Sequence, residues 1–286
     1  MVFRIVSPAP ALRAFVQHYL LVHVRYEGPA LAQAMKPMPP APQQCLYFYP
    51  RGGVRTFHHR EGRFVELPRS IVVGPQVSRL DLHFPPEHLV VGAAFQPGGL
   101  HRLLGAPVAE MLDFSLESRA LLGPPLAEVE ARLAEAPTYA AMLATLEAYL
   151  LGRLRRLRSQ AEQPLDRLLP LLLPGRLGAS LDQLAADACL SPRQFERRFV
   201  ERVGLSPKLF ARIARFDQAF RLKERQPELD WLAVALHCGY YDYRHLVRDF
   251  REFGGTTPPQ LLAAETTHTR VAGGAAANHL PMSFFY

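Results

Sequence analysis

The sequence predicts an α+β protein in two parts, and three observations support this fold class. Residues 1–115 hold short apolar runs between proline and glycine turn signals, a pattern typical of the strands of a small β-barrel or sandwich. Residues 126–158 place apolar side chains three and four positions apart, which predicts amphipathic helices. Residues 165–265 are helical in pattern throughout. We therefore expect an N-terminal β-barrel or sandwich with helices, followed by an all-α domain.

The composition is ordinary for a globular protein, with a basic balance. The 286 residues include 33 basic and 26 acidic side chains, so the formal net charge is +7. This charge permits a polyanionic partner without requiring one. No apolar run is long enough to span a bilayer, because charged residues and prolines interrupt the richest stretch, residues 165–177. Residues 1–25 lack the order of a signal peptide, so we expect a cytoplasmic protein without a membrane partner.

Four apolar runs of the N-terminal part are predicted strands. They span residues 45–49, 53–57, 70–73 and 89–95. Side chains alternate along a strand, so Tyr47 and Tyr49 share one face while Phe48 lies on the other. The alternation does not say which face points inward. Two helices follow, predicted over residues 126–134 and 138–158.

The second of these helices carries a long apolar stripe. The stripe comprises Tyr139, Met142, Leu143, Leu146, Tyr149, Leu150 and Leu154. It either packs on the barrel within the chain or pairs with a second subunit. We expect a homodimer through this helix, because the stripe offers more apolar surface than the flank of a small barrel covers. Residues 159–164 read as a short linker, so the first domain is predicted to span residues 1–160.

The C-terminal part holds a first predicted helix-turn-helix unit. Ser180 with Gln183 forms the pattern of a capping box, in which each residue satisfies a backbone amide of the other. Ser191 and Gln194 repeat this pattern at the start of a second helix. The second helix has an apolar stripe, a glycine stop and a charged face, formed by Phe195, Phe199 and Val203, by Gly204, and by Arg193, Glu196, Arg197 and Arg198. Arginines on such a face can grip guanine edges or phosphates.

A second unit of the same kind follows, and a long helix from Ser206 to about Arg225 joins the two. The second unit consists of a short helix within residues 230–239 and a helix capped by Asp242 that runs from Tyr243 to Phe253. A rigid body of this type can place two recognition helices in successive major grooves of DNA. Residues 193–225 contain ten basic and four acidic side chains, so the positive field is local.

Residues 184–258 resemble the DNA-binding domain of the AraC/XylS family of transcriptional regulators. The resemblance is densest over residues 233–240 and 245–255 and at Thr257-Pro258, and residues 184–207 agree with it as well. Matched by position, it implies DNA-binding residues at Arg193, Glu196, Arg197, Tyr243, Arg244, Val247 and Arg248. Glu196 either accepts from a cytosine amino group or orients a neighbouring arginine. We favour orientation, because the phosphate field penalises a free carboxylate.

Residues 94–105 are similar to a segment of the sensor domains of some family members. The resemblance implies a cupin-like barrel, a small-molecule effector and an encounter with RNA polymerase. Candidate effector-binding residues are Tyr47, Arg51, Arg55 and His58. The predicted domains are thus a sensor over residues 1–160, a DNA-binding domain over residues 165–265 and a flexible tail over residues 266–286.

We expect neither a metal, nor a cofactor, nor an enzyme. The adjacent His58 and His59 point to opposite faces of a strand and cannot share one metal ion. No nucleophile elbow or phosphate loop occurs. Cys45, Cys189 and Cys238 lie far apart, which favours reduced thiols, with Cys45 in the core rather than reactive. Two alternatives remain: a regulator that binds a partner protein instead of a small ligand, and an enzyme fused to a DNA-binding module.

Overall fold

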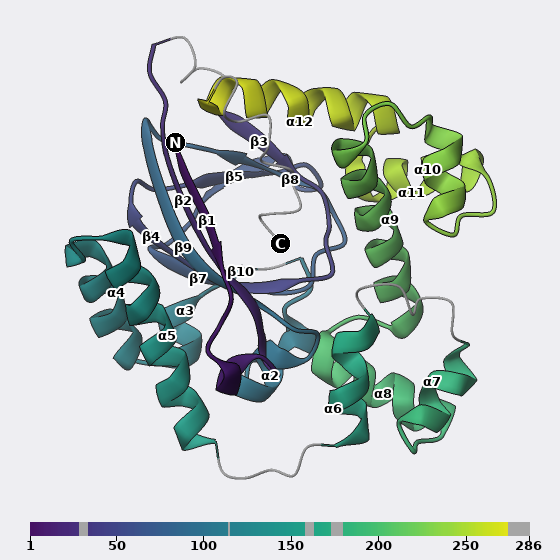
Figure 1. The fold of residues 1–286 in the computed structure, drawn as a ribbon, viewed down its shortest axis with the longest axis horizontal. Coiled ribbons are helices and arrows are strands. Elements are labelled where there is room, and N and C mark those ends of the chain that lie inside the picture. The colour runs from purple at the N-terminus through teal and green to yellow at the C-terminus, as the bar shows by residue number, and fades with distance from the viewer. Residues whose placement is uncertain (29–33, 114, 158–162, 173–179, 274–286) are drawn as a thin grey trace.

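A computed structural model of the chain describes residues 1–28, 34–113, 115–157, 163–172 and 180–273. Figure 1 shows a β-rich N-terminal part with helices on one side and, beside it, a C-terminal part made of helices. The predicted α+β fold class is confirmed. No described helix combines the length and the apolar character that crossing a membrane requires.

The described residues of the N-terminal part form two antiparallel sheets. The larger sheet has the order β1 (Val2–Val6), β2 (Val16–Arg25), β9 (Glu87–Phe95), β4 (Gln44–Arg51), β7 (Ser70–Val73) and β10 (Ser115–Glu117). The smaller sheet has the order β3 (Met35–Met38), β8 (Leu80–His83), β5 (Arg55–His58) and β6 (Arg63–Glu66). The four predicted strands correspond to β4, β5, β7 and β9.

The two faces of the larger sheet have different partners. Leu46, Phe48 and Val91 face the helices and join the largest apolar cluster. Tyr47 and Tyr49 point the opposite way, against the apolar cluster that contains Val90. Tyr47 and Tyr49 are therefore the inward-facing side chains of β4. The helices and turns of this part are η1 (Pro10–Leu12), α2 (Gly99–Leu104), η2 (Val108–Glu110), α3 (Ser118–Leu122), α4 (Pro125–Glu135) and α5 (Tyr139–Arg156).

Helix α5 packs its apolar stripe within the chain. Leu146 and Leu150 are fully buried, Met142 is buried, and all three belong to the same cluster as the outer face of the larger sheet. The expectation that this stripe forms a dimer interface is therefore wrong. The stripe is long because the sheet, α2 and α4 together provide more apolar surface than the sequence pattern alone indicated.

The C-terminal part contains the predicted helices in the predicted order. They are α6 (Pro164–Leu168), η3 (Leu169–Leu172), α7 (Leu181–Asp187), α8 (Pro192–Val203), α9 (Pro207–Arg225), α10 (Trp231–His237), α11 (Tyr243–Gly254) and α12 (Pro258–Gly273). Their shared apolar cluster begins at Leu165 and ends at Leu261. The boundary predicted at residue 265 falls inside α12, which continues to Gly273. Most of the predicted linker, and residues 274–286 of the predicted tail, lie outside the described residues.

Polar contacts join the two parts. Lys36 of β3 forms an ion pair with Glu265 of α12, and both side chains are almost completely buried. The side-chain amide of Gln44 donates to the carbonyl oxygen of Val203 at 2.7 Å. Gly204 ends α8 with a φ of +80°, and a Cβ there would lie 2.5 Å from Pro75 and from the carbonyl oxygen of Val108. The end of α8 is thus seated directly on the N-terminal part.

Candidate nucleic-acid interface

Helix α8 begins at the capping box that the sequence predicted. The Ser191 hydroxyl accepts from the amide of Gln194 at 3.3 Å, and the Gln194 side chain accepts from the amide of Ser191 at 3.1 Å. The Ser180 box is only half formed, because Gln183 donates its side chain to Asp187 instead. Phe195, Phe199 and Val203 are buried and orient the helix, so its other face is turned outward.

That outward face of α8 carries the predicted contact residues. Arg193, Glu196 and Arg197 are exposed, and no described residue forms an ion pair with either arginine. Glu196 likewise lies beyond ion-pair distance of both, so the predicted orienting contact is not made in this structure. Arg198 is turned away, since its guanidinium donates to the Gln163 side chain at 2.9 Å. Two guanidinium groups therefore remain available to a polyanion on this helix.

Helix α11 repeats the arrangement. The Asp242 carboxylate caps it by accepting from the amide of His245 at 2.8 Å, and this hydrogen bond lowers the pKa of Asp242. Leu246, Phe250 and Phe253 are buried against α9 and its neighbours. The predicted contact residues take the other face: Arg244 and Arg248 are exposed, while Tyr243 and Val247 are half-buried beside them.

Arg212 of α9 holds α11 in place, a role that the sequence did not indicate. Its guanidinium donates to Asp249 at 2.7 Å and to Glu252 at 2.6 and 3.0 Å. The hydrogen bonds that Arg212 donates to Glu252 and Asp249 raise the pKa of Arg212, and the hydrogen bond accepted from Arg212 lowers the pKa of Glu252. The guanidinium also lies 4.9 Å from the centre of the Phe253 ring. One clue was present: the two acidic residues lie three apart on α11, which puts them on one face.

Several other basic residues of the 193–225 segment also have structural partners. Arg202 lies 3.4 Å from Asp166, and Arg221 lies 2.8 Å from Asp217. The Lys223 ammonium donates to the carbonyl oxygens of Pro227 and Leu229. The positive charge of this segment that faces outward is accordingly smaller than the count of ten basic residues suggested: its exposed basic residues are Arg193 and Arg197 of α8 and Lys208 and Arg225 of α9.

The four predicted effector-binding residues do not come together. Tyr47 lines a cavity of about 30 Å³ between the sheets, which it shares with Phe84 and His88. Arg51 and Arg55 line two further, separate cavities. His58 instead makes a hydrogen bond with Thr56 at 3.0 Å. Between the described residues, the cavity of about 30 Å³ next to Tyr47 has room for about one or two water molecules.

The described residues contain no group of three or more His, Cys, Asp or Glu side chains that could hold a metal ion. Cys45 is buried, and burial raises the pKa of its thiol to about 12. Cys238 is buried as well, and burial raises its pKa to about 11. Both thiols stay protonated at neutral pH, which fits core cysteines rather than nucleophiles.

Two helix-turn-helix units, α7–α8 and α10–α11, thus lie at opposite ends of α9 (Figure 1). Each presents exposed arginines on its second helix, and this combination defines a helix-turn-helix domain of the DNA-binding class.

Comparison with known proteins agrees with this class. Residues 184–264 match a helix-turn-helix domain family, and residues 4–117 match a family described as a domain of unknown function, DUF6597. Over 81 residues the chain is 35% identical to an uncharacterized HTH-type transcriptional regulator of Haemophilus influenzae; this match covers 28% of the chain and 26% of that protein. The chain therefore carries an AraC-type helix-turn-helix domain, which confirms the predicted resemblance.

Two of the solved structures with similarity to the chain come from Vibrio cholerae and Chromobacterium violaceum. One is ToxT from Vibrio cholerae, 10% identical, covering 86% of this chain and 97% of that one with a TM-score of 0.46. Another is an AraC-type transcriptional regulator from Chromobacterium violaceum, 26% identical, covering 30% of this chain and 77% of that one with a TM-score of 0.28. The chain spans about a quarter of the length of the Haemophilus relative, 26%.

Proposed function

We propose that the protein is a sequence-specific DNA-binding regulator of transcription. The observation that carries the proposal is the pair of second helices, α8 and α11, whose exposed arginines have no described ion-pair partner. Both helices are tied to α9, so they can act as one rigid reader of two successive major grooves. Arg193, Arg197, Arg244 and Arg248 supply the cationic contacts, Tyr243 and Val247 the apolar ones, and Glu196 accepts from a cytosine amino group or orients an arginine once DNA is bound.

Selection of a binding site from random duplexes with the full-length protein tests this proposal. On the selected site, Arg197→Ala and Arg244→Ala should each weaken binding by about 1–3 kcal/mol and relax specificity at different base pairs. Arg132→Ala removes the same charge from an exposed position of α4 and serves as the matched control. Failure to enrich any sequence contradicts the proposal. Equal losses on selected and random DNA would mean that the two arginines only grip phosphates.

We further propose that residues 1–160 form a sensing domain and that residues 165–265 form the DNA-binding domain. The large apolar clusters support this division, since one ends at Leu150 and the next begins at Leu165. An effector that favours one arrangement of the two domains would shift the population able to bind DNA. A homodimer and an encounter with RNA polymerase stay predictions, the homodimer now without the stripe of α5 as its interface.

A second candidate is a regulator whose N-terminal domain binds a partner protein. The small volume of the cavity beside Tyr47 and Tyr49 favours it, because among the described residues that cavity measures about 30 Å³. The two candidates share the DNA-binding domain and differ in what the N-terminal domain binds. If a small ligand binds the purified chain and changes its affinity for DNA, the first candidate, a regulator controlled by a small effector, is supported.

A further inference from the structure

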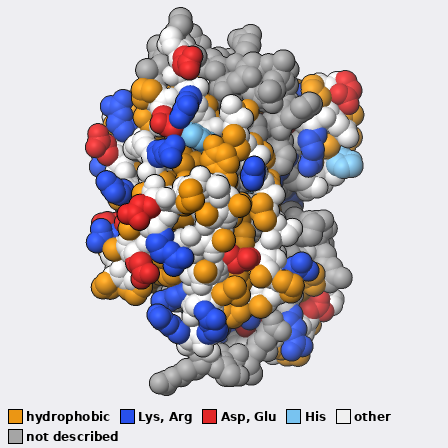
Figure 2. Space-filling model, turned by 60° about the vertical axis from the view of Figure 1, so that its left-hand side comes forward, with side chains coloured by type: hydrophobic (Ala, Val, Ile, Leu, Met, Phe, Trp, Pro, Cys, Tyr) orange, Lys and Arg blue, Asp and Glu red, His pale blue; other side chains and the backbone are white. Residues whose placement is uncertain are grey.

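A large cavity lies outside the barrel, at the corner where α4 meets α5. Its volume is about 590 Å³, within the range of small-molecule sites. Its lining combines two arginines with apolar groups and contains no acidic side chain: Arg4, Arg51, Leu89, Ala136, Pro137, Thr138, Tyr139, Ala140 and Met142. Figure 2 brings forward the side of the molecule with α4 and α5, where Lys and Arg side chains surround hydrophobic ones.

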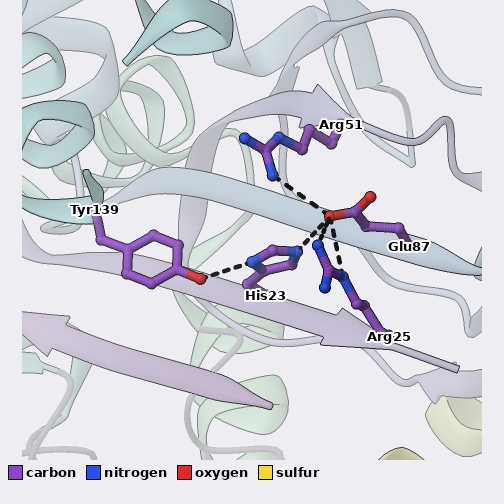
Figure 3. Close-up of polar contacts among 5 residues, drawn as sticks. All are labelled: His23, Arg25, Arg51, Glu87 and Tyr139. Carbon is purple, nitrogen blue, oxygen red and sulfur yellow. Dashed lines mark hydrogen bonds and ion pairs between the residues drawn. The ribbon is translucent and has the colours of Figure 1, made fainter. Parts of the chain in front are cut away.

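A hydrogen-bonded chain fixes one wall of this cavity (Figure 3). The Tyr139 hydroxyl lies 2.7 Å from Nδ1 of His23, and Nε2 of His23 lies 2.8 Å from the Glu87 carboxylate. His23 is 11% exposed, so strand β2 holds the first residue of α5 through a largely buried ring. The hydrogen bonds hold this wall in place without a ligand, so binding loses less conformational entropy.

The charge at this corner is unbalanced. Glu87 is shared among His23, Arg25 and Arg51, and Arg51 lies at 3.5 Å from its Oε1, a long contact. Arg4 has no described acidic partner; its guanidinium lies 5.5 Å from the centre of the Tyr139 ring. Three arginines, Arg4, Arg25 and Arg51, thus lie near one carboxylate, which contacts Arg25 and Arg51 but not Arg4. Arg4 and Arg51 line the cavity, and Arg51 holds the carboxylate only through its long contact.

We propose that this cavity binds a small organic anion with an apolar body. Arg4 and Arg51 contact the carboxylate or phosphate group, since guanidinium forks pair with both. Ala136, Pro137 and the ring of Tyr139, which are not fully buried, cover the apolar body. The site lies on the outer side of the larger sheet, so it is separate from the space beside Tyr47. Binding of the anion at this site does not depend on the proposed function. Only the consequence of binding rests on it, namely that the anion acts as the effector through the start of α5.

Binding is tested with the full-length protein and two probes, phenyl phosphate and benzoate, by isothermal titration at constant ionic strength. Benzyl alcohol serves as the uncharged comparison. At least one anion should bind saturably at one site, and the better head group distinguishes a phosphate ligand from a carboxylate ligand. Arg4→Gln/Arg51→Gln should weaken that binding at least about tenfold, because two charge-assisted contacts are lost.

Two further variants keep the test decisive. Arg132→Gln removes an exposed positive charge from α4 outside the cavity and should leave the affinity unchanged. Arg4→Lys/Arg51→Lys keeps the charge, replaces the fork with a point charge and should bind with intermediate affinity. Circular dichroism establishes that each variant is folded. The inference is overturned if neither anion binds saturably, if benzyl alcohol binds equally well, or if the Arg4→Gln/Arg51→Gln variant binds like the wild type.

A separate measurement addresses the consequence for DNA. DNA affinity is measured with and without the better probe, in the wild type and in Arg4→Gln/Arg51→Gln. A probe-dependent change confined to the wild type supports the anion as effector. A wild type that binds the anion but no DNA contradicts the proposed function and leaves the site standing. A wild type that binds DNA but no anion contradicts the site alone.

Discussion

At the scale of single residues, the buried His88 and the half-buried His18 remain neutral in the folded protein at neutral pH. His88 lies 4.6 Å from the ring of Phe84, and burial, with the nearby charge of His23, lowers its pKa to about 3. Burial and Arg221 lower the pKa of His18 to about 4. Among the described residues, neither Nδ1 of His88 nor Nε2 of His18 has a hydrogen-bond partner. In the unfolded chain both rings take up a proton near pH 6.5.

The unfolded state therefore binds more protons than the folded state once the pH falls below about 6.5. The contribution of these histidines to the free energy of unfolding should be fully present above that pH. It should fall by about 1 kcal/mol per pH unit for each histidine down to pH 4. His88→Leu should make this loss shallower. Urea unfolding at a series of pH values checks the prediction, with His237→Leu on the exposed side of α10 as control. If the free energy of unfolding changes equally with pH in the wild type and in His88→Leu, the prediction is contradicted.

At the scale of elements, what the sequence could predict depended on the range of the interaction. The caps at Ser191 and Asp242 were readable, because a cap involves residues three positions apart. The stripe of α5 was equally visible, yet its partner was not, since an apolar face does not specify what covers it. Arg212 binds two acidic residues about forty positions further along, a contact that no local pattern indicates. The corner cavity was missed because β1, β9 and the start of α5 meet only in the folded chain.

The burial of α5 gives an element-scale prediction. Leu146 is 0% exposed in the core cluster, so Leu146→Ala should lower the free energy of unfolding by about 2–5 kcal/mol. Leu157, which follows the same helix, is 38% exposed, and Leu157→Ala should cost less than about 1 kcal/mol. Urea unfolding measures both. A stable Leu146→Ala protein with an altered sedimentation coefficient would instead restore the stripe as a subunit interface.

At the scale of the whole molecule, a buried ion pair connects the N-terminal part to α12. Lys36 and Glu265 are nearly inaccessible, and burial raises the pKa of Glu265 while the Lys36 charge opposes that rise. The second carboxylate oxygen, Oε2, has no hydrogen-bond partner. Removal of Lys36 would leave this carboxylate buried without its cation, which is far more costly than the loss of an exposed pair.

Lys36→Met should accordingly reduce the free energy of unfolding by about 3–5 kcal/mol at neutral pH. A raised pKa means that folding takes up a proton, so the deficit should shrink as the pH is lowered and Glu265 becomes neutral. Lys36→Met/Glu265→Leu should recover part of the loss. Urea unfolding followed by Trp231 fluorescence measures all three proteins. A deficit that is independent of pH, or that the double variant does not reduce, would contradict this assignment.

The contacts between the end of α8 and the N-terminal part also limit which other chains could exchange one of the two parts with this chain. Gly204 fits against Pro75 and Val108 only because it has no side chain, and Gln44 occupies the carbonyl oxygen of Val203. A hybrid that takes its N-terminal part from this chain and its helical part from another needs a glycine at the end of the helix equivalent to α8 and a carboxylate opposite Lys36. Exchange of the two parts therefore favours chains that already share these contact residues.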